Sequence, residues 1–244
     1  MQKLKQLTAL CMAAFLFFSC DKVKDLLGSE DGRLLADLRL KQFTRDDRTY
    51  KLHYHRNGRI DSVTASGPNS SYTYRVSYTG QKIDSSSLWQ NGELISSKKN
   101  VTYDLAGRIT GYTYQLHVYP QPPRSFQLTY NPQGDVYIIA NTSSSDTLLY
   151  SSNHALTDRF TPFNHYHYTN DSSLNPLNHT ANLVIFTEEY FAELWLSKRN
   201  VTQEVINGSS HQTTNFTNEF DSRGRIIKRT ASGYTPGLIT YTYF

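Results

Sequence analysis

A short phrase that recurs along this chain constrains its fold more than any other feature. The phrase begins with a run of alternating polar and apolar residues that ends in Tyr or another apolar residue. A polar turn that contains Gly follows, and in most copies the turn is followed by a basic residue and then Ile or Val. Alternation with a period of two places one set of side chains on each face of a β-strand. Asp or Asn caps the start of the bend, and Gly supplies the positive φ that a hairpin loop needs. Each copy therefore predicts a β-hairpin, and the copies span 50–60, 72–83, 101–109, 126–136 and 220–226.

Consecutive hairpins of this kind predict an all-β fold. We expect a curled antiparallel β-meander, either open or partly closed into a barrel-like sheet. A β-sandwich whose hairpins resemble one another by chance is the alternative. A longer echo favours internal duplication, because Ser97–Thr102 returns as Ser197–Thr202 with a single change, from Lys99 to Arg199. Both copies of this echo are expected to begin a strand.

The interval from about 145 to 198 interrupts the hairpin rhythm with loop-forming Asn and Pro residues. Near its end, residues 187–196 predict one short helix, because Thr187 can cap it and Phe191, Leu194 and Trp195 share one face. The chain ends with alternating residues over 239–244, which predict a final strand.

The amino-terminal residues have the pattern of a bacterial lipoprotein signal. Lys3 and Lys5 precede an apolar stretch, Leu7–Phe18, that is shorter than the roughly 20 residues needed to span a bilayer. A lipobox then ends in Cys20, whose thiol we expect to be lipidated; the alternative is an ordinary signal peptide with Cys20 present by chance. The prediction divides the chain into a signal peptide (1–19), a lipidated tether (20–34) and a single β-meander domain (35–244). We expect an outer-membrane lipoprotein that is exposed at the surface or faces the periplasm.

Composition narrows the classes of function. Cys11 lies within the predicted signal, so the mature chain keeps only Cys20 and has neither a disulfide framework nor a Cys-based metal site. Removal of Lys3 and Lys5 lowers the formal net charge from +4 to +2, and no basic block remains that would suit nucleic acid. The 18 Tyr residues favour β-sheets with partly solvent-exposed faces and a small hydrophobic core.

The phrase at Tyr103–Ile109, echoed at Phe220–Ile226, resembles the YD repeats of bacterial Rhs and teneurin-like shells. With the lipobox, the Pro162–Asn164 loop and the segment 197–202, the chain from about 35 to 244 resembles the DUF4595 family of Bacteroidetes lipoproteins of unknown function. The resemblance implies a curled, porin-like antiparallel meander and no catalytic residue. This chain is much shorter than an Rhs shell, which encloses a cavity with many more hairpins.

Stripes of tyrosine on predicted strands are the candidate binding surface. Tyr offers apolar area with a polar tip, so an exposed Tyr ladder can stack on sugars or pack against a protein. The alternative is that the rings stabilise the sheet as cross-strand pairs. The candidate ligand-binding residues are Tyr72, Tyr74, Tyr78, Tyr112, Tyr114 and Trp195.

Other residue patterns were weighed for chemistry. His165 and His167 lie on one face of a predicted strand, but a third ligand at a recognisable spacing is missing, so we expect a polar aromatic strand and no metal site. The chain contains no Gly-x-Ser-x-Gly elbow, His-Glu-x-x-His pair or P-loop, so we expect no catalytic residue and no cofactor. Ser62 and Thr147 match a short O-glycosylation pattern of exported Bacteroidetes proteins.

These features predict an envelope lipoprotein that binds without catalysis and presents an aromatic sheet face to a polysaccharide or a protein. A structural or assembly accessory of an outer-membrane complex is the rival interpretation, and a glycan hydrolase is a third. The expected partners are the membrane, through the lipid, and a polysaccharide or outer-membrane protein, with no nucleic acid.

Overall fold

The computed structural model describes residues 39–177 apart from 69, 120 and 142, residue 185, and residues 196–244 apart from 209 and 235. These residues fall into two units: Leu40–Thr242, and a small unit whose described part is Arg39 with Tyr243 and Phe244. In the small unit, Arg39 Cζ lies 4.7 Å from the centre of the Phe244 ring. The predicted signal peptide, Cys20 and the tether over 20–34 lie outside the described residues.

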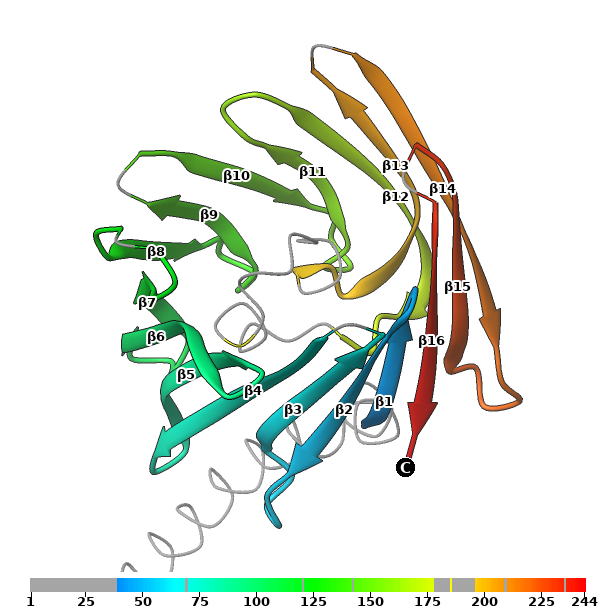
Figure 1. Cartoon of the computed structure of the whole chain (residues 1–244). Helices are drawn as coiled ribbons and strands as arrows, with labels where there is room; N and C mark the ends of the chain where they lie inside the picture. The colour runs from blue at the N-terminus through cyan, green and yellow to red at the C-terminus, as the bar shows by residue number, and fades with distance from the viewer. Residues whose placement is uncertain are drawn as a thin grey trace, which may run out of the picture. The chain divides into compact units, whose positions relative to one another are not determined.

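The unit Leu40–Thr242 is a closed antiparallel barrel in which each strand pairs with its neighbours in sequence and β1 pairs with β16 (Figure 1). The predicted antiparallel meander is confirmed, and it closes completely. At the closure, the Asp46 N–H donates to the Leu238 carbonyl at 2.8 Å, and the Leu238 N–H donates to Asp46 Oδ1 at 3.1 Å. The strands are β1 (Leu40–Arg45), β2 (Arg48–Tyr54), β3 (Ile60–Gly67), β4 (Ser70–Thr79), β5 (Lys82–Gln90), β6 (Glu93–Tyr103), β7 (Ile109–Leu116), β8 (Arg124–Tyr130), β9 (Val136–Asn141), β10 (Ser145–Tyr150), β11 (Leu156–Phe160), β12 (His165–Leu174), β13 (Arg199–Asn207), β14 (His211–Phe220), β15 (Ile226–Gly233) and β16 (Gly237–Tyr243).

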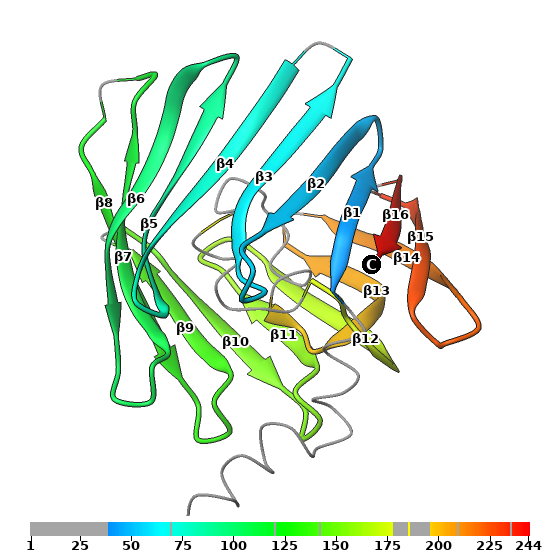
Figure 2. The same cartoon turned by 90° about the horizontal axis from the view of Figure 1, so that it is seen from below.

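The two ends of the barrel carry different connections (Figure 2). Because neighbouring strands are antiparallel, all connections after even-numbered strands lie at one end, which we call the turn rim. The connections after odd-numbered strands lie at the other end, which we call the mouth rim. All five predicted hairpin turns follow even-numbered strands and therefore share the turn rim. The chain also enters β1 at this rim.

The turn Asp104–Arg108 shows why the phrase contains the residues it does. The backbone N–H and Nε of Arg108 donate to the Asp104 carboxylate at 2.9 and 2.7 Å, and the backbone bond lowers the pKa of that carboxyl. The Gly107 N–H donates to the Asp104 carbonyl at 3.0 Å, and Gly107 has φ +80°, where a side chain would be strained. Asp221–Arg225 repeats both carboxylate bonds, at 2.9 and 2.8 Å.

A sixth copy of the turn lies at Ser151–Ala155 and was missed in the sequence. The Ser151 N–H donates to the Ala155 carbonyl at 3.0 Å, and four of the five predicted turns contain the equivalent bond. His154 occupies the glycine position with φ +62°, and its Nδ1 lies 2.9 Å from Asp135 Oδ1 in the neighbouring turn. This turn contains neither Gly nor Lys or Arg, so it can be identified as a copy only from its backbone conformation and hydrogen bonding.

Tyrosines at the ends of successive even-numbered strands join neighbouring hairpins along the turn rim. Each hydroxyl donates to a backbone carbonyl at the start of the odd-numbered strand one hairpin earlier: Tyr54 to Leu40 at 2.7 Å, Tyr78 to Ile60 at 2.7 Å, Tyr103 to Ile83 at 2.7 Å and Tyr130 to Ile109 at 2.6 Å. The basic residue before three of these carbonyls lies over the same ring: Arg59 over Tyr78 at 4.3 Å, Lys82 over Tyr103 at 4.9 Å and Arg108 over Tyr130 at 4.4 Å. The phrase therefore recurs because each copy contacts the next.

Side chains alternate between the barrel interior and its outer surface. On β4, Tyr74 and Val76 are buried, whereas Arg75 and Ser77 on the opposite face are exposed. The exposed positions of β2 and β4 are all polar: Lys51, His53, Ser71, Arg75, Ser77 and Thr79. The apolar side chains of these strands are thus gathered inside the ring.

Two predictions about irregular segments have separate outcomes. The helix over 187–196 lies outside the described residues except for Leu196, which is 6% exposed. Arg199 begins β13, as expected for one copy of the echo, but the expectation that Ser97–Thr102 begins a strand is wrong. The Asn91–Gly92 turn already returns the chain to the sheet at Glu93, so the echo falls inside β6. Among the described residues, no helix is long and apolar enough to cross a membrane.

Candidate functional site

The interior wall formed by β4 to β8 combines aromatic, apolar and polar side chains. Cross-strand pairing places side chains from five neighbouring strands in one row: Val76, Ser86, Lys98, Tyr114 and Arg124. A second row crosses four of the strands: Tyr74, Leu88, Ser96 and Leu116. Lys98 is fully buried in the first row, so the wall includes a cation as well as rings.

Three aromatic rings of β7 and β8 contact one another on this wall. Tyr112 and Phe126 stack with their centroids 5.0 Å apart, and Tyr114 meets Phe126 edge-on at 6.5 Å. Tyr112 is buried, whereas Tyr114 and Phe126 keep part of their surface exposed. The wall therefore offers partly exposed apolar ring surface, from Tyr114 and Phe126, beside a phenolic hydroxyl group.

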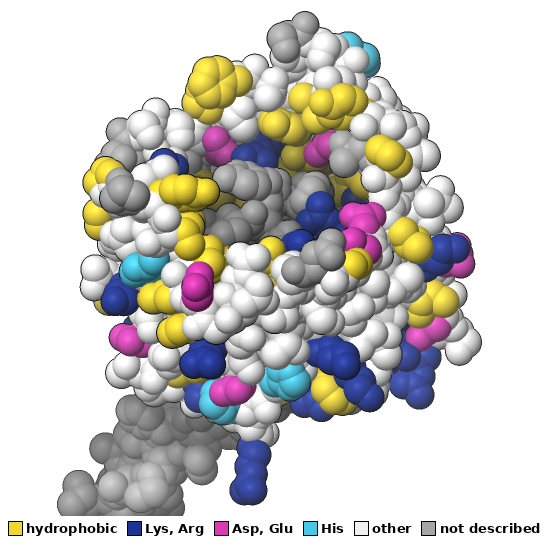
Figure 3. Space-filling model, in the orientation of Figure 1, with side chains coloured by type: hydrophobic (Ala, Val, Ile, Leu, Met, Phe, Trp, Pro, Cys, Tyr) yellow, Lys and Arg dark blue, Asp and Glu magenta, His cyan; other side chains and the backbone are white. Residues whose placement is uncertain are grey.

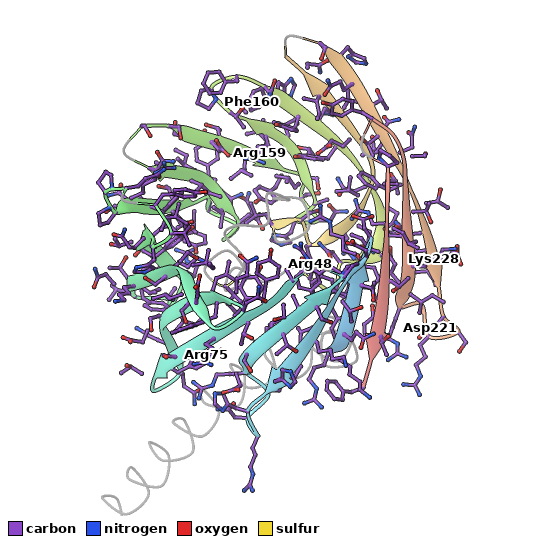
Figure 4. All side chains as sticks on the ribbon, viewed as in Figure 1. Arg48, Arg75, Arg159, Phe160, Asp221 and Lys228 are labelled. Carbon is purple, nitrogen blue, oxygen red and sulfur yellow. The ribbon has the colours of Figure 1, made fainter. Side chains whose placement is uncertain are left out.

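Three cations of the barrel interior lie over aromatic rings. The pairs are Arg48 with Tyr72 at 4.8 Å, Lys98 with Tyr114 at 5.7 Å and Arg159 with Tyr166 at 5.3 Å. Figure 4 places Arg48 and Arg159 on the inner side of the ring of strands. Figure 3 shows apolar and charged side chains around the centre of this face of the molecule. Contacts of this kind orient a cation while leaving the far face of its group available.

Arg159 on β11 is bound to a carboxylate on the neighbouring strand. Its Nε donates to Asp146 Oδ2 at 2.9 Å, and its Nη2 lies 2.7 Å from the same oxygen. Burial acts to lower the pKa of Arg159, but the charge and hydrogen bond of Asp146, together with Tyr168 and Tyr166, outweigh burial and hold the pKa above its ordinary value. This ion pair is therefore a fixed feature of the interior at β10 and β11, outside the wall of β4 to β8.

The five described candidate tyrosines all lie on the interior face of the barrel, and their role in ligand binding stays a prediction. Closure of the barrel turns the aromatic face of β4 and β7 inward, and Tyr74 and Tyr112 are only 3% and 5% exposed. Tyr78 is bonded into the turn rim. Tyr72 and Tyr114 keep partial exposure, and they remain candidates for contact with a ligand. Trp195 lies outside the described residues.

The remaining candidate residues lie on the outer surface. Ser62 Oγ donates to Asp61 Oδ2 at 3.1 Å, and Thr147 pairs across the sheet with Phe160; O-glycosylation of both stays a prediction. His165 Nε2 and His167 Nδ1 both contact Asp158 Oδ1, at 2.8 and 3.0 Å. Among the described residues, no group of three His, Cys, Asp or Glu side chains could hold a metal ion.

The sequence analysis missed the interior cations. Lys98 and Arg229, on β6 and β15, are 0% and 3% exposed, yet each is flanked in sequence by residues typical of a wet surface. Alternation alone could have located them, since Arg229 is two residues from Ala231 and so shares its face. Without the closure of the barrel, there was no reason to assign that face to the interior.

Comparison with known proteins shows similarity at the level of the fold. No family model and no curated protein matches the chain. A porin-like protein from Bacteroides uniformis is 17% identical with a TM-score of 0.58, over 84% of this chain and 98% of that chain. A porin-like protein from Bacteroides vulgatus is 12% identical with a TM-score of 0.42, over the same shares of the two chains. A chain of the Photorhabdus luminescens Tc holotoxin pore is 12% identical with a TM-score of 0.31, over 75% of this chain and 12% of that chain. The first of these likenesses shows that the protein has a porin-like barrel fold, and membership of the DUF4595 family stays a prediction.

Proposed function

We propose that this protein is an envelope lipoprotein whose barrel binds a carbohydrate at the mouth rim, without catalysis. The observation that carries the proposal is the partly exposed aromatic and polar wall of β4–β8 inside a closed barrel. Binding sites for small ligands are concave and mostly apolar, with a few placed polar groups. The barrel interior has this character, whereas the outer surface of β2 and β4 is convex and polar.

The residues nearest the mouth rim suit a sugar ring. Tyr72, Tyr114 and Phe126 offer partly exposed ring faces, on which the apolar face of a pyranose can stack. Gln90, opposite Tyr72 in the sheet, and Arg124, opposite Tyr114, add groups that hydrogen-bond to hydroxyls. Each of these polar residues is a terminal residue of its strand at the mouth rim.

The chain's connectivity relates the proposed anchor to the proposed site. β1 begins at the turn rim, so a tether that ends in a lipidated Cys20 joins the barrel at the end opposite the mouth rim. Stable anchoring needs more than one acyl chain, which a triacylated cysteine provides.

The test is titration of the purified full chain with a panel of neutral and acidic oligosaccharides, followed by isothermal calorimetry. Tyr72→Ala and Tyr114→Ala are each expected to weaken binding by about tenfold, since a stacked ring contributes on the order of 1 kcal/mol or more. Tyr137→Ala is the matched control, because Tyr137 on β9 is 38% exposed. Equal affinities for all three variants, or no binding by the wild type across the panel, would refute the proposal.

A second candidate function, an accessory of a larger assembly, is favoured by the aromatic residues on the mouth-rim connections. Phe163, Tyr119 and Tyr234 are 86%, 65% and 58% exposed, and each lies between an odd-numbered strand and the next. Exposed aromatic groups of this size are typical of protein interfaces. Loss of a co-purifying envelope protein from the Phe163→Ser variant, with oligosaccharide binding absent from the wild type, would favour this alternative.

A further inference from the structure

Arg229 is a buried cation with no polar partner among the described residues. The residue is 3% exposed and lies in the middle of β15 on the interior face, whereas its neighbours Lys228 and Thr230 face outward. Its Nε and Nη2 are both buried and make no hydrogen bond. Its guanidinium lies over the Phe216 ring, whose centroid is 3.9 Å from Cζ.

A second unpaired polar atom lies on the strand beside it. Asn218 is directly opposite Arg229 in the pairing of β14 with β15, and its Oδ1 is buried without a hydrogen bond. The orientation of this amide is fixed, because its Nδ2 donates to Asp171 Oδ2 at 3.0 Å. Asn218 therefore leaves an acceptor next to the two unused donors of Arg229.

The carboxylate that belongs to this cluster is already occupied. Asp171 accepts from Asn218 with Oδ2, and its Oδ1 accepts from the Ser173 N–H at 2.8 Å and from the Ser173 hydroxyl. No ion pair joins Asp171 to Arg229 in the part of the chain that the structure describes. The cluster thus has a buried positive charge and a carboxylate turned to other partners.

A buried guanidinium with unsatisfied N–H donors is unfavourable unless an acceptor pairs with it. A guanidinium stays charged at physiological pH, and a buried charge is costly unless it is paired and hydrogen-bonded. The Phe216 ring compensates only in part, because a cation–π contact leaves every N–H donor of the group unsatisfied. Two buried donors of Arg229 are therefore positioned to hold an anion.

We infer that Arg229, Asn218 and Phe216 form a binding site for an oxyanion, a carboxylate or a phosphate, on a ligand that also carries a hydroxyl group. The inference deepens the proposed function, because it specifies an acidic sugar derivative as the ligand of the barrel interior. Nε–H and Nη2–H project from one edge of a guanidinium, and this edge matches the two oxygens of a carboxylate or phosphate. Asn218 Oδ1 accepts from the adjacent hydroxyl, and the Phe216 ring fixes the plane of the guanidinium.

The test measures thermal unfolding of the purified full chain at constant ionic strength, with sodium phosphate, sodium galacturonate or neutral galactose added. The variant Arg229→Met removes the charge but keeps an unbranched side chain, and Arg229→Lys keeps the charge without the two-donor edge. Lys228→Gln is the matched control: it removes one cation from the adjacent position, which Figure 4 shows on the outer side of the ring and where Nζ contacts Glu219 at 2.6 Å.

We expect phosphate or galacturonate to raise Tm in the wild type and in Lys228→Gln, and galactose to leave it unchanged. In Arg229→Met the anion effect is lost, and in Arg229→Lys the affinity falls by about tenfold or more. Without anion, Arg229→Met is expected to be at least as stable as the wild type, because it removes an unpaired buried charge. The more effective anion distinguishes a carboxylate from a phosphate ligand.

Equal anion-dependent shifts in the wild type and Arg229→Met, or no shift with either anion in the wild type, would overturn the inference. Strong destabilisation of Arg229→Met without anion would also count against it, since it would assign Arg229 a purely structural role. These outcomes are independent of the proposed function, which is judged by oligosaccharide affinity at Tyr72 and Tyr114. Oligosaccharide binding that is unaffected by Arg229→Met would retain the function and reject the anion site.

Discussion

Removal of the single hydroxyl of Tyr130 tests whether the turn rim is held together by its tyrosines. Tyr130 ends β8, and its hydroxyl donates to the Ile109 carbonyl on β7 at 2.6 Å. Arg108 lies over the same ring at 4.4 Å. Tyr130→Phe keeps the ring and its contact with Arg108, so the substitution isolates the hydrogen bond.

The expected loss follows from the environment of the bond. A net hydrogen bond contributes about 0.5–1.5 kcal/mol, and an acceptor left unsatisfied in a buried site costs more. Tyr130 is only partly buried, so water can reach the Ile109 carbonyl after substitution. We therefore expect Tyr130→Phe to lower the free energy of unfolding by about 1 kcal/mol, or Tm by about 2–4 °C for a domain of this size.

Alkaline pH gives a second readout of the same residue. Burial raises the pKa of Tyr130 to about 12, above the value of 10.0 for free tyrosine. The unfolded chain therefore loses this proton first, so the stability contributed by the neutral phenol is complete below pH 10.0 and is lost as pH rises towards 12. The full shift corresponds to about 2.7 kcal/mol, which solvent screening of a partly exposed group reduces to about 1 kcal/mol.

The assay is urea unfolding of the full chain at pH 8 and at pH 11, for the wild type, Tyr130→Phe and Tyr137→Phe. Tyr137 is the control, because it lies on the neighbouring strand β9 and is 38% exposed. At pH 8 only Tyr130→Phe should be destabilised, and at pH 11 its difference from the wild type should shrink. If Tyr130→Phe and Tyr137→Phe unfold at the same urea concentration at pH 8, the hydroxyl bond does not stabilise the rim.

Two further predictions concern a turn and the outer surface. Gly107→Ala is expected to destabilise the barrel by about 1 kcal/mol and Gly107→Asn by less, as measured by thermal unfolding; no atom lies within 4 Å of the added Cβ, so the cost is that of φ +80° alone. Burial acts to raise the pKa of Asp158, but hydrogen bonds from His167 and His165 outweigh it and lower the pKa. The stability that this carboxylate contributes is complete above the ordinary Asp value of 3.8 and is lost as pH falls through the lowered pKa. Asp158→Asn should therefore flatten the decline of the urea midpoint below that pH.

The turns could be predicted from the sequence because their determinants are local. Asp104 and Gly107 act within five residues, through one carboxylate and one backbone angle. Closure of the ring depends on Asp46 and Leu238, which are 192 positions apart and have no sequence signal that joins them. The antiparallel meander was therefore predictable, whereas its completion into a barrel was not.

The same gap explains why the sequence could not place the aromatic face of the candidate site inside a barrel. Tyr74 and Arg75 alternate visibly, so the two faces of β4 could be told apart in the sequence. An open sheet would leave the aromatic face available to an outside ligand, and only closure buries Tyr74. His154 illustrates a different limit, because a non-glycine residue at φ +62° is stabilised by Asp135, a contact between turns that no local pattern reports.

The outer surface of the barrel leads to a prediction about how the protein is held at a membrane. Lys51 on β2 and Arg75 on β4 are exposed outward, whereas Val63 and Leu148 are fully buried on the inner side. A lysine or arginine that faces lipid costs about 2–4 kcal/mol at the bilayer midplane, so we expect the outer surface of β2 and β4 to contact water. Attachment would then depend on the lipid at Cys20.

We therefore expect Cys20→Ala to abolish palmitate labelling and to move the chain from the detergent phase to the aqueous phase in a phase-separation assay. Thermal unfolding of the barrel should stay unchanged, because the strands begin at Leu40, well beyond the substituted residue. A matched Ser19→Ala change keeps a small residue before the cysteine and should leave the chain in the detergent phase. Retention of Cys20→Ala in the detergent phase would mean that the outer surface of the strands itself binds lipid, and the polar positions at Lys51 and Arg75 would then have to lie outside the contact.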